Sequence, residues 1–251
     1  NSRGLGDVYK RQLALRLPDG SRAPIADAPL HSQAGAALFT RFGGPDYLYW
    51  DWSNNPADPY KVKGGHELRI SHLAYVQPLP DATPPEWTTR FYPEGGMAIF
   101  RSGWDSDALV FTLMGESGSA RKTVHDHVDG TSFLMAAYGD MLLMDTGYYK
   151  PNDLNNAVTS GPESHNVILI DGEGAPDKGL LNDWGDTDAF IENTIDGELI
   201  DYAESRQQYA DTDIVRGVVM VRDRYFVIAD RLSGEGDAER EYRFRYHAHA
   251  G

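Results

Sequence analysis

The chain has 251 residues and a formal net charge of −15, from 23 Lys and Arg against 38 Asp and Glu. This balance argues against a nucleic-acid or anionic-membrane surface, because both attract clustered Lys and Arg. The absence of cysteine excludes a disulfide framework, a thiol nucleophile and a Cys-ligated zinc site. A hydrophobic fraction of 41% indicates a packed core. Catalytic or metal chemistry therefore has to come from the eight histidines, the carboxylates and the tyrosines.

The chain before residue 91 is expected to contain two different parts. Residues 1–12 begin without Met and show no relation to the rest of the chain, so we expect them to be non-native assembly sequence. Residues 13–90 are mixed, with a short helix predicted over 33–42 and a proline-rich extended linker over 78–87. The aromatic residues of 45–59 fit either a packing surface or a sugar platform.

From residue 92 onward the sequence changes to short apolar runs separated by Gly and Asp turns. Strands are predicted over 97–100, 108–114, 132–138, 141–144, 167–170, 214–221, 225–229 and 242–249. A hairpin turn is predicted at Gly139-Asp140. This pattern, with almost no helical period, predicts a large antiparallel β-sandwich over 91–251. Because the last predicted strand reaches the end of the chain, we expect an internal fragment of a longer protein.

Acidic residues are concentrated in one stretch of the chain. Between Asp177 and Asp213 there are eleven acids against only Lys178 and Arg206. We interpret this stretch as a solvated face that accounts for much of the net charge.

Three histidines fall between residues 125 and 165. If their segment is extended, His125 and His127 point to the same face, because strand side chains alternate with a period of two. Such a pair can supply two metal ligands, or one ligand and one acid/base group. Exposed polar positions of a strand are the simpler interpretation of this spacing.

Two further residues strengthen a metal interpretation. Asp145 ends the apolar run 142–144, and an unpaired buried carboxylate is costly. It could instead cap a turn onto Gly147. His165 opens the apolar run 167–170, where it could also be an ordinary satisfied polar residue. Together with His127, these residues offer two nitrogens and one carboxylate oxygen, a donor set suited to zinc with room for a fourth ligand.

Four ordered segments of the chain resemble motifs of the heparinase II/III-like polysaccharide lyases. They are residues 92–104, the H-x-H-x-D-x-x-S-F pattern of 125–133, residues 144–148 and residues 164–172. The resemblance covers about residues 78–251 well, and residues 30–77 as the last helices of a preceding domain.

The resemblance implies a mainly β fold, a large antiparallel β-sandwich preceded here by a short helical remnant of an (α/α) toroid. It implies β-elimination on an acidic polysaccharide such as alginate or a glycosaminoglycan. His125 is then the catalytic acid/base residue, while His127, Asp145 and His165 hold a zinc ion of structural role. Asp129 and Asn166 fit supporting positions in the turn and the site wall, but ordinary structural roles are the simpler interpretation of both. A periplasmic or secreted location is implied as well.

The chain departs from this family in lacking most of the toroid, which normally carries the catalytic Tyr and the group that neutralises the uronate carboxylate. We therefore expect the full-length parent to be a lyase and the fragment alone to be inactive. Two other functions remain open: a noncatalytic carbohydrate-binding sandwich, and a hydrolase in which zinc activates a water molecule.

Overall fold

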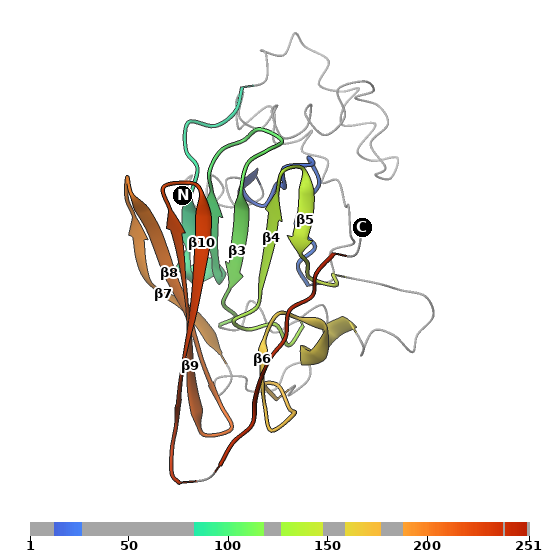
Figure 1. The fold of residues 1–251 in the computed structure, drawn as a ribbon, viewed down its shortest axis with the longest axis vertical. Coiled ribbons are helices and arrows are strands. Elements are labelled where there is room, and N and C mark those ends of the chain that lie inside the picture. The colour runs from blue at the N-terminus through green and yellow to red at the C-terminus, as the bar shows by residue number, and fades with distance from the viewer. Residues whose placement is uncertain are drawn as a thin grey trace, which may run out of the picture.

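Figure 1 shows the fold in a computed structural model, which describes residues 13–26, 83–117, 127–147, 159–176, 188–237 and 239–249. The described part consists mainly of antiparallel strands in three sheets. Its strands and 3-10 turns are β1 (Arg90–Tyr92), η1 (Pro93–Gly95), β2 (Met97–Arg101), β3 (Val110–Met114), β4 (Phe133–Ala137), β5 (Asp140–Leu143), η3 (Pro162–Ser164), β6 (Ile168–Ile170), β7 (Ala189–Asp196), β8 (Ile200–Tyr209), β9 (Thr212–Val221), β10 (Tyr225–Gly234) and β11 (Tyr242–Phe244). The predicted antiparallel sandwich is confirmed. Within these ranges, no helix has the length and apolar character that a membrane crossing requires.

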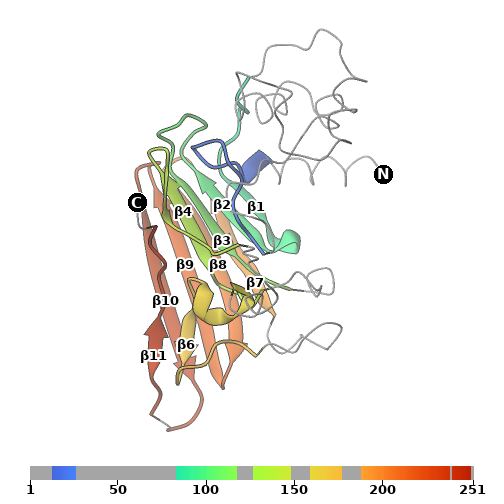
Figure 2. The same ribbon diagram turned by 90° about the vertical axis from the view of Figure 1, so that its right-hand side faces the viewer.

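The first sheet is a meander in the order β1-β2-β3-β4-β5, and its central strands β2, β3 and β4 are buried on both faces. Side chains of alternate residues point to opposite faces, so β2 sends Ala98 and Phe100 one way and Met97 and Ile99 the other. This is why its central strands are continuous apolar runs rather than alternating patterns. The Phe100 face packs against the second sheet, which Figure 2 shows lying alongside the first.

Residues 13–26 cover the opposite face of the first sheet. They form a small hairpin with a bridge between Arg16 and Arg22, and their apolar side chains join Met97 and Ile99 in one cluster. The fully buried guanidinium of Arg101 fastens this hairpin. It donates hydrogen bonds to the carbonyl oxygens of Ala14 (3.2 Å) and Arg16, and its Cζ lies 4.1 Å from the centre of the Trp104 ring. The helix predicted over 33–42 lies outside the described residues.

The second sheet has the order β10-β9-β8-β7 and contains two strands that the sequence did not predict. Both β7 and β8 lie in the acidic stretch that was interpreted only as a solvated face. Their acids largely occupy the outer face, as with the paired residues Glu192 and Glu204. Asp201 is the exception, because it is buried and accepts a hydrogen bond from the Thr89 hydroxyl at 2.5 Å.

The third sheet pairs β6 with β11 and links the other parts together. After β11 the chain continues in extended form beside both β6 and β5. Arg245 N–H donates to the Val167 carbonyl at 2.9 Å, and Met144 N–H donates to the His247 carbonyl at the same distance. We call residues 245–249 the closing segment, because they join the end of β5 to the start of β6.

The predicted hairpin between β4 and β5 is confirmed, with its turn one residue earlier than expected. Tyr138 and Gly139 both have positive φ, 56° and 79°, and β5 already begins at Asp140. Two successive positive φ values are the signature of a type I′ turn, whose twist matches that of the flanking strands.

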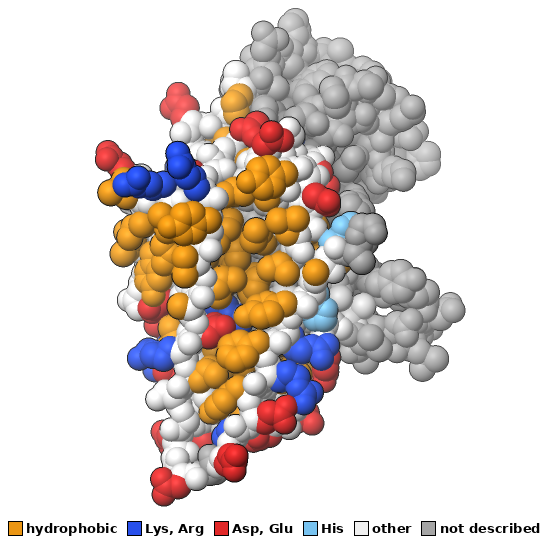
Figure 3. Space-filling model, viewed as in Figure 1, with side chains coloured by type: hydrophobic (Ala, Val, Ile, Leu, Met, Phe, Trp, Pro, Cys, Tyr) orange, Lys and Arg blue, Asp and Glu red, His pale blue; other side chains and the backbone are white. Residues whose placement is uncertain are grey.

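Large hydrophobic side chains remain exposed on β5, β10 and the segment that starts with β11. Figure 3 shows a band of hydrophobic side chains running across this face of the molecule. Exposed members on these elements are Leu142, Tyr225, Val227, Phe244 and Tyr246. The described sandwich therefore presents apolar side chains to solvent along β10, where the second sheet ends.

We predict that Arg101→Met lowers the free energy of unfolding by about 2–4 kcal/mol, because it leaves buried carbonyl oxygens of residues 13–26 without their donor. Urea unfolding monitored by circular dichroism measures the change. Arg90→Met is the matched control. The Arg90 side chain is 38% exposed, and its surface ion pair with Asp196 is long, at 3.9 Å. We expect the control to change stability by no more than about 0.5 kcal/mol. Equal effects of the two substitutions would contradict the role given to Arg101.

Candidate metal centre

Two of the predicted ligands are brought together by strand ends. Asp145 follows β5 and His165 precedes β6, and the closing segment binds both neighbourhoods through the backbone of 245 and 247. Because one extended segment pairs with both strand ends, side chains that are 20 residues apart in sequence come into direct contact.

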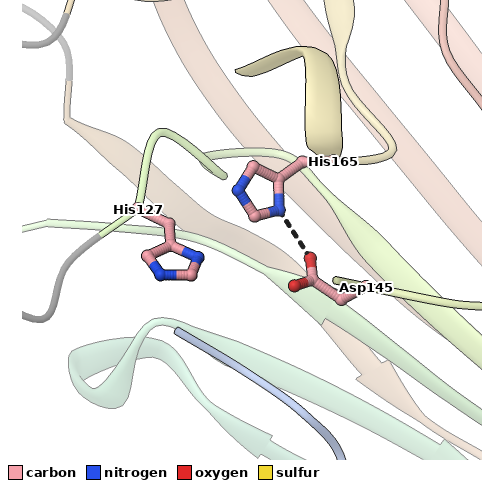
Figure 4. A group of neighbouring side chains, drawn as sticks. All are labelled: His127, Asp145 and His165. Carbon is pink, nitrogen blue, oxygen red and sulfur yellow. Dashed lines mark hydrogen bonds and ion pairs between the residues drawn. The ribbon is translucent and has the colours of Figure 1, made fainter. Parts of the chain in front are cut away.

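Figure 4 shows His127, Asp145 and His165 converging in the interior of the described structure. Nδ1 of His165 lies 2.7 Å from Oδ2 of Asp145, and the two imidazole centroids are 5.2 Å apart with their planes at 46°. Each residue offers one ligand atom, and these atoms all lie within 4.8 Å of one another. The three side chains are almost completely buried, with exposures of 1%, 0% and 0% in sequence order.

Asp145 also makes the turn contact that its sequence position suggested. Its Oδ1 accepts a hydrogen bond from Gly147 N–H at 3.0 Å, and Gly147 has a φ of 54°. The turn-cap interpretation and the metal interpretation are therefore both compatible with the geometry, since one oxygen faces the turn and the other faces His165.

The charge of His165 is set by competing effects. Burial lowers the pKa of this imidazole, but the charge of Asp145, the hydrogen bond to it and the charge of Asp129 outweigh burial and hold the pKa above its ordinary value. The Thr159 backbone also contributes to the raised pKa of His165, although buried Nε2 has no well-aligned hydrogen bond within the described part of the chain. A metal ion would satisfy such a nitrogen, whereas an orphaned polar atom in the interior is costly.

The third predicted ligand lies on a loop rather than in a strand. His127 begins the loop 127–132 that leads into β4, and Val128 N–H donates to the Ser160 carbonyl at 2.8 Å. Gly130 is packed so tightly that a Cβ added there would lie 2.6 Å from Nε2 of Gln207 on β8. The loop is thus confined between two elements, which fixes the position of His127.

Arg216 on β9 is a site residue that the sequence interpretation missed. Its fully buried guanidinium donates to the carbonyl oxygens of Thr131 at 2.9 Å and Asn166 at 2.5 Å, and it pairs with both carboxylate oxygens of Asp230 at 2.7 and 3.1 Å. It therefore holds the loop of His127 and the segment of His165 against the same strand. An arginine within the apolar run 214–221 was the available signal, because a charged residue there requires buried partners.

Asn166 is fully buried beside the cluster, and its contacts are extensive. Its Nδ2 donates to the carbonyl oxygens of Phe133 (2.6 Å) and Met144 (3.1 Å), and its Oδ1 accepts from His247 N–H at 2.7 Å. Its own N–H donates to the Ser132 hydroxyl at 3.0 Å. One side chain thus connects β4, the residue before Asp145 and the closing segment.

The predicted catalytic residue His125 lies outside the described residues. The expectation that it shares a face with His127 therefore stays a prediction. Of the four site residues proposed from sequence, the structure brings together the three proposed as metal ligands. Two imidazole nitrogens and a carboxylate oxygen, in a chain without cysteine, form a donor set that fits zinc.

Comparison with solved structures identifies similar folds. The heparan sulfate lyase HepC from Pedobacter heparinus has a TM-score of 0.66 at 18% identity, over 89% of this chain and 31% of that one. A heparinase III has a TM-score of 0.67 at 14% identity, over 94% of this chain and 35% of that one. The chain thus spans about a third of the length of these relatives. No curated protein sequence matches the chain significantly.

The sequence itself matches a family model over residues 84–251, and that model is described as heparinase II/III-like, C-terminal. The match covers most of the chain and includes all three residues of the metal cluster as well as both sheets of the sandwich. The chain therefore belongs to the heparinase II/III-like C-terminal domain family.

Proposed function

We propose that the protein is the β-sandwich part of a polysaccharide lyase that cleaves a uronic-acid-containing polysaccharide by β-elimination. The observation that carries this proposal is the convergence of His127, Asp145 and His165 from three separate segments into one buried cluster. Membership of the heparinase II/III-like family supports the reaction class.

In this reaction a base removes the proton at C5 of the uronic acid. The electron pair forms a C4–C5 double bond, and the glycosidic oxygen at C4 leaves and takes up a proton, so no water is consumed. The C5 proton is weakly acidic, and a group that neutralises the carboxylate lowers the barrier. We assign proton transfer to His125, because an imidazole titrates near neutral pH.

We assign zinc to His127, Asp145 and His165, where it would cross-link three chain segments. A structural role fits their burial, since a catalytic zinc needs an open position for water or substrate. Two residues span at most about 7 Å, so fixing His127 would limit where His125 can lie. The same burial argues against the hydrolase alternative, which requires an accessible metal-bound water.

The proposed substrate is an acidic polysaccharide such as alginate or a glycosaminoglycan. The net charge of −15 does not oppose this, because eleven of the acids fall between Asp177 and Asp213, outside the motif segments that contain the cluster. An exported location in the periplasm or outside the cell would give access to such a polymer.

We predict that His125→Ala in the full-length parent lowers the rate of unsaturated-uronate formation by about 10²–10⁴-fold, because it removes the proton-transfer group. Absorbance of the C4–C5 double bond measures the product. Zinc content should stay unchanged. His249→Ala is the matched control, since the His249 side chain is 41% exposed and lies 3.7 Å from Asp140 on the surface. Retained turnover in His125→Ala would assign the base elsewhere, and products without a double bond would reject elimination.

The 251 residues alone are expected to release no unsaturated product from alginate or glycosaminoglycans, because the chain covers only about a third of each related lyase. The same absorbance assay tests this, with a known lyase as positive control. Turnover by the isolated chain would show that it holds a complete active site.

We predict that the protein binds one zinc ion. Loss of an outer-shell partner weakens metal binding by up to about 100-fold, so loss of the direct ligand in His127→Ala should weaken it by more than that. Competition with a chromophoric chelator measures the affinity. Zinc at about 100 times its Kd should add about 2.7 kcal/mol to the unfolding free energy of the wild type but not of the variant. His249→Ala should behave like the wild type. Unchanged zinc in His127→Ala would reject the ligand set.

A further inference from the structure

Asp129 is a buried carboxylate whose presence the fold alone does not explain. Its side chain is 0% exposed, and neither carboxylate oxygen has a hydrogen-bond partner in the described part of the chain. An ionised carboxylate without partners in the interior costs several kcal/mol, so such groups are normally paired with a cation or bound to a metal.

The loop that carries Asp129 leaves it little freedom to turn toward solvent. The Asp129 carbonyl accepts a hydrogen bond from Ser132 N–H at 2.9 Å, and Thr131 N–H donates to the Met114 carbonyl at 3.1 Å. The next residue, Gly130, is held tightly against Gln207. The carboxylate is therefore kept inside by contacts of the backbone at residues 129, 130 and 131.

The nearby cationic side chain of Arg216 already has its partners. Its guanidinium is engaged by Asp230 and by the carbonyl oxygens of Thr131 and Asn166. The charge of Asp129 instead acts on His165, one of the three clustered ligands. The oxygens of Asp129 are not among the ligand atoms that lie within 4.8 Å of one another. Asp129 follows His127 by two residues, which span at most about 7 Å, so the carboxylate belongs to the surroundings of the cluster but not to its innermost set of donors.

The position of Asp129 would balance the charge of a divalent cation bound by the cluster. The cluster supplies one negative charge, from Asp145, because neutral imidazoles are the form that binds metal. A divalent cation there would leave one positive charge uncompensated in the interior. A second carboxylate close by would make the buried assembly neutral.

We propose that Asp129 is the outer-shell partner of the metal centre, a positioning residue that balances the second charge of a divalent cation and accepts a hydrogen bond from its water or a ligand. This inference rests on the metal site of the proposed function. It adds a residue to that site and predicts that affinity depends on a group that does not coordinate the ion.

The test compares zinc affinity in the wild type, Asp129→Asn and Asp196→Asn by chelator competition. We expect Asp129→Asn to weaken zinc binding by about 10–100-fold, the range seen when outer-shell partners are lost. Asp196→Asn removes the same charge from a side chain that is 63% exposed, and should leave the affinity unchanged. We also expect the metal-free Asp129→Asn protein to be at least as stable as the wild type in urea, because an uncompensated charge has been removed.

If Asp129→Asn does not fold, Asp129→Leu replaces it, since leucine has a similar shape without polar atoms. Equal zinc affinity in the wild type and the folded Asp129 variant would overturn the inference while leaving the three-ligand site intact. A loss of metal-free stability with unchanged zinc affinity would overturn it as well, because that result marks a purely structural carboxylate. Failure of the wild type to bind zinc would reject the metal site itself, a separate outcome.

Discussion

The buried guanidinium of Arg216 is the constraint on which the candidate site depends. A charged group that is 0% exposed must have its donors satisfied by the protein, and here the acceptors are Asp230 and two backbone carbonyls. Those carbonyls belong to the loop after His127 and to the residue after His165. Removing one partner of a buried ion pair costs about 3–5 kcal/mol. The two histidine-bearing segments are therefore held in place by the second sheet before any cation is considered.

The first sheet is subject to a related constraint, because its central strands are buried on both faces. Phe100, Phe111 and Phe133 pack in the cluster that the first sheet forms with the second, with Phe111 and Phe133 stacked at 4.9 Å between ring centroids. The opposite face relies on residues 13–26, fastened by Arg101. Burial on both faces makes β3 and β4 stiff supports for the loop that lies between them and carries His127.

The sequence predicted those parts of the fold in which local pattern and final environment agree. Apolar runs became β2, β3, β6 and β9, and the Gly139 turn became a hairpin. Strand β8 was missed because three of its inward-facing residues, Asp201, Ser205 and Gln207, are polar, so the sequence shows no alternation of apolar and polar residues. The hydrogen bond that accommodates Asp201 comes from Thr89, 112 residues away. The three clustered ligands were predictable because ordered motifs contain them. Arg216 was not predicted, because its acceptors lie on a neighbouring strand and in two loops and do not show in the local pattern. Asp129 belongs to the same motif as His127 and was given only a supporting position, because the local sequence does not reveal its complete burial.

The closing segment makes the assembly of the His127, Asp145 and His165 cluster depend on the order of synthesis. His127, Asp145 and His165 emerge from the ribosome within 39 residues of one another, yet the backbone bonds that align Met144 with Val167 come from 245 and 247, about 80 residues later. Contacts of such long sequence separation form slowly, because loop-closure entropy opposes them until the whole segment is available. A nascent chain would thus hold its ligand residues for some time without the alignment that brings them together. The alignment of these three side chains therefore depends on residues that are synthesised about 80 positions after His165.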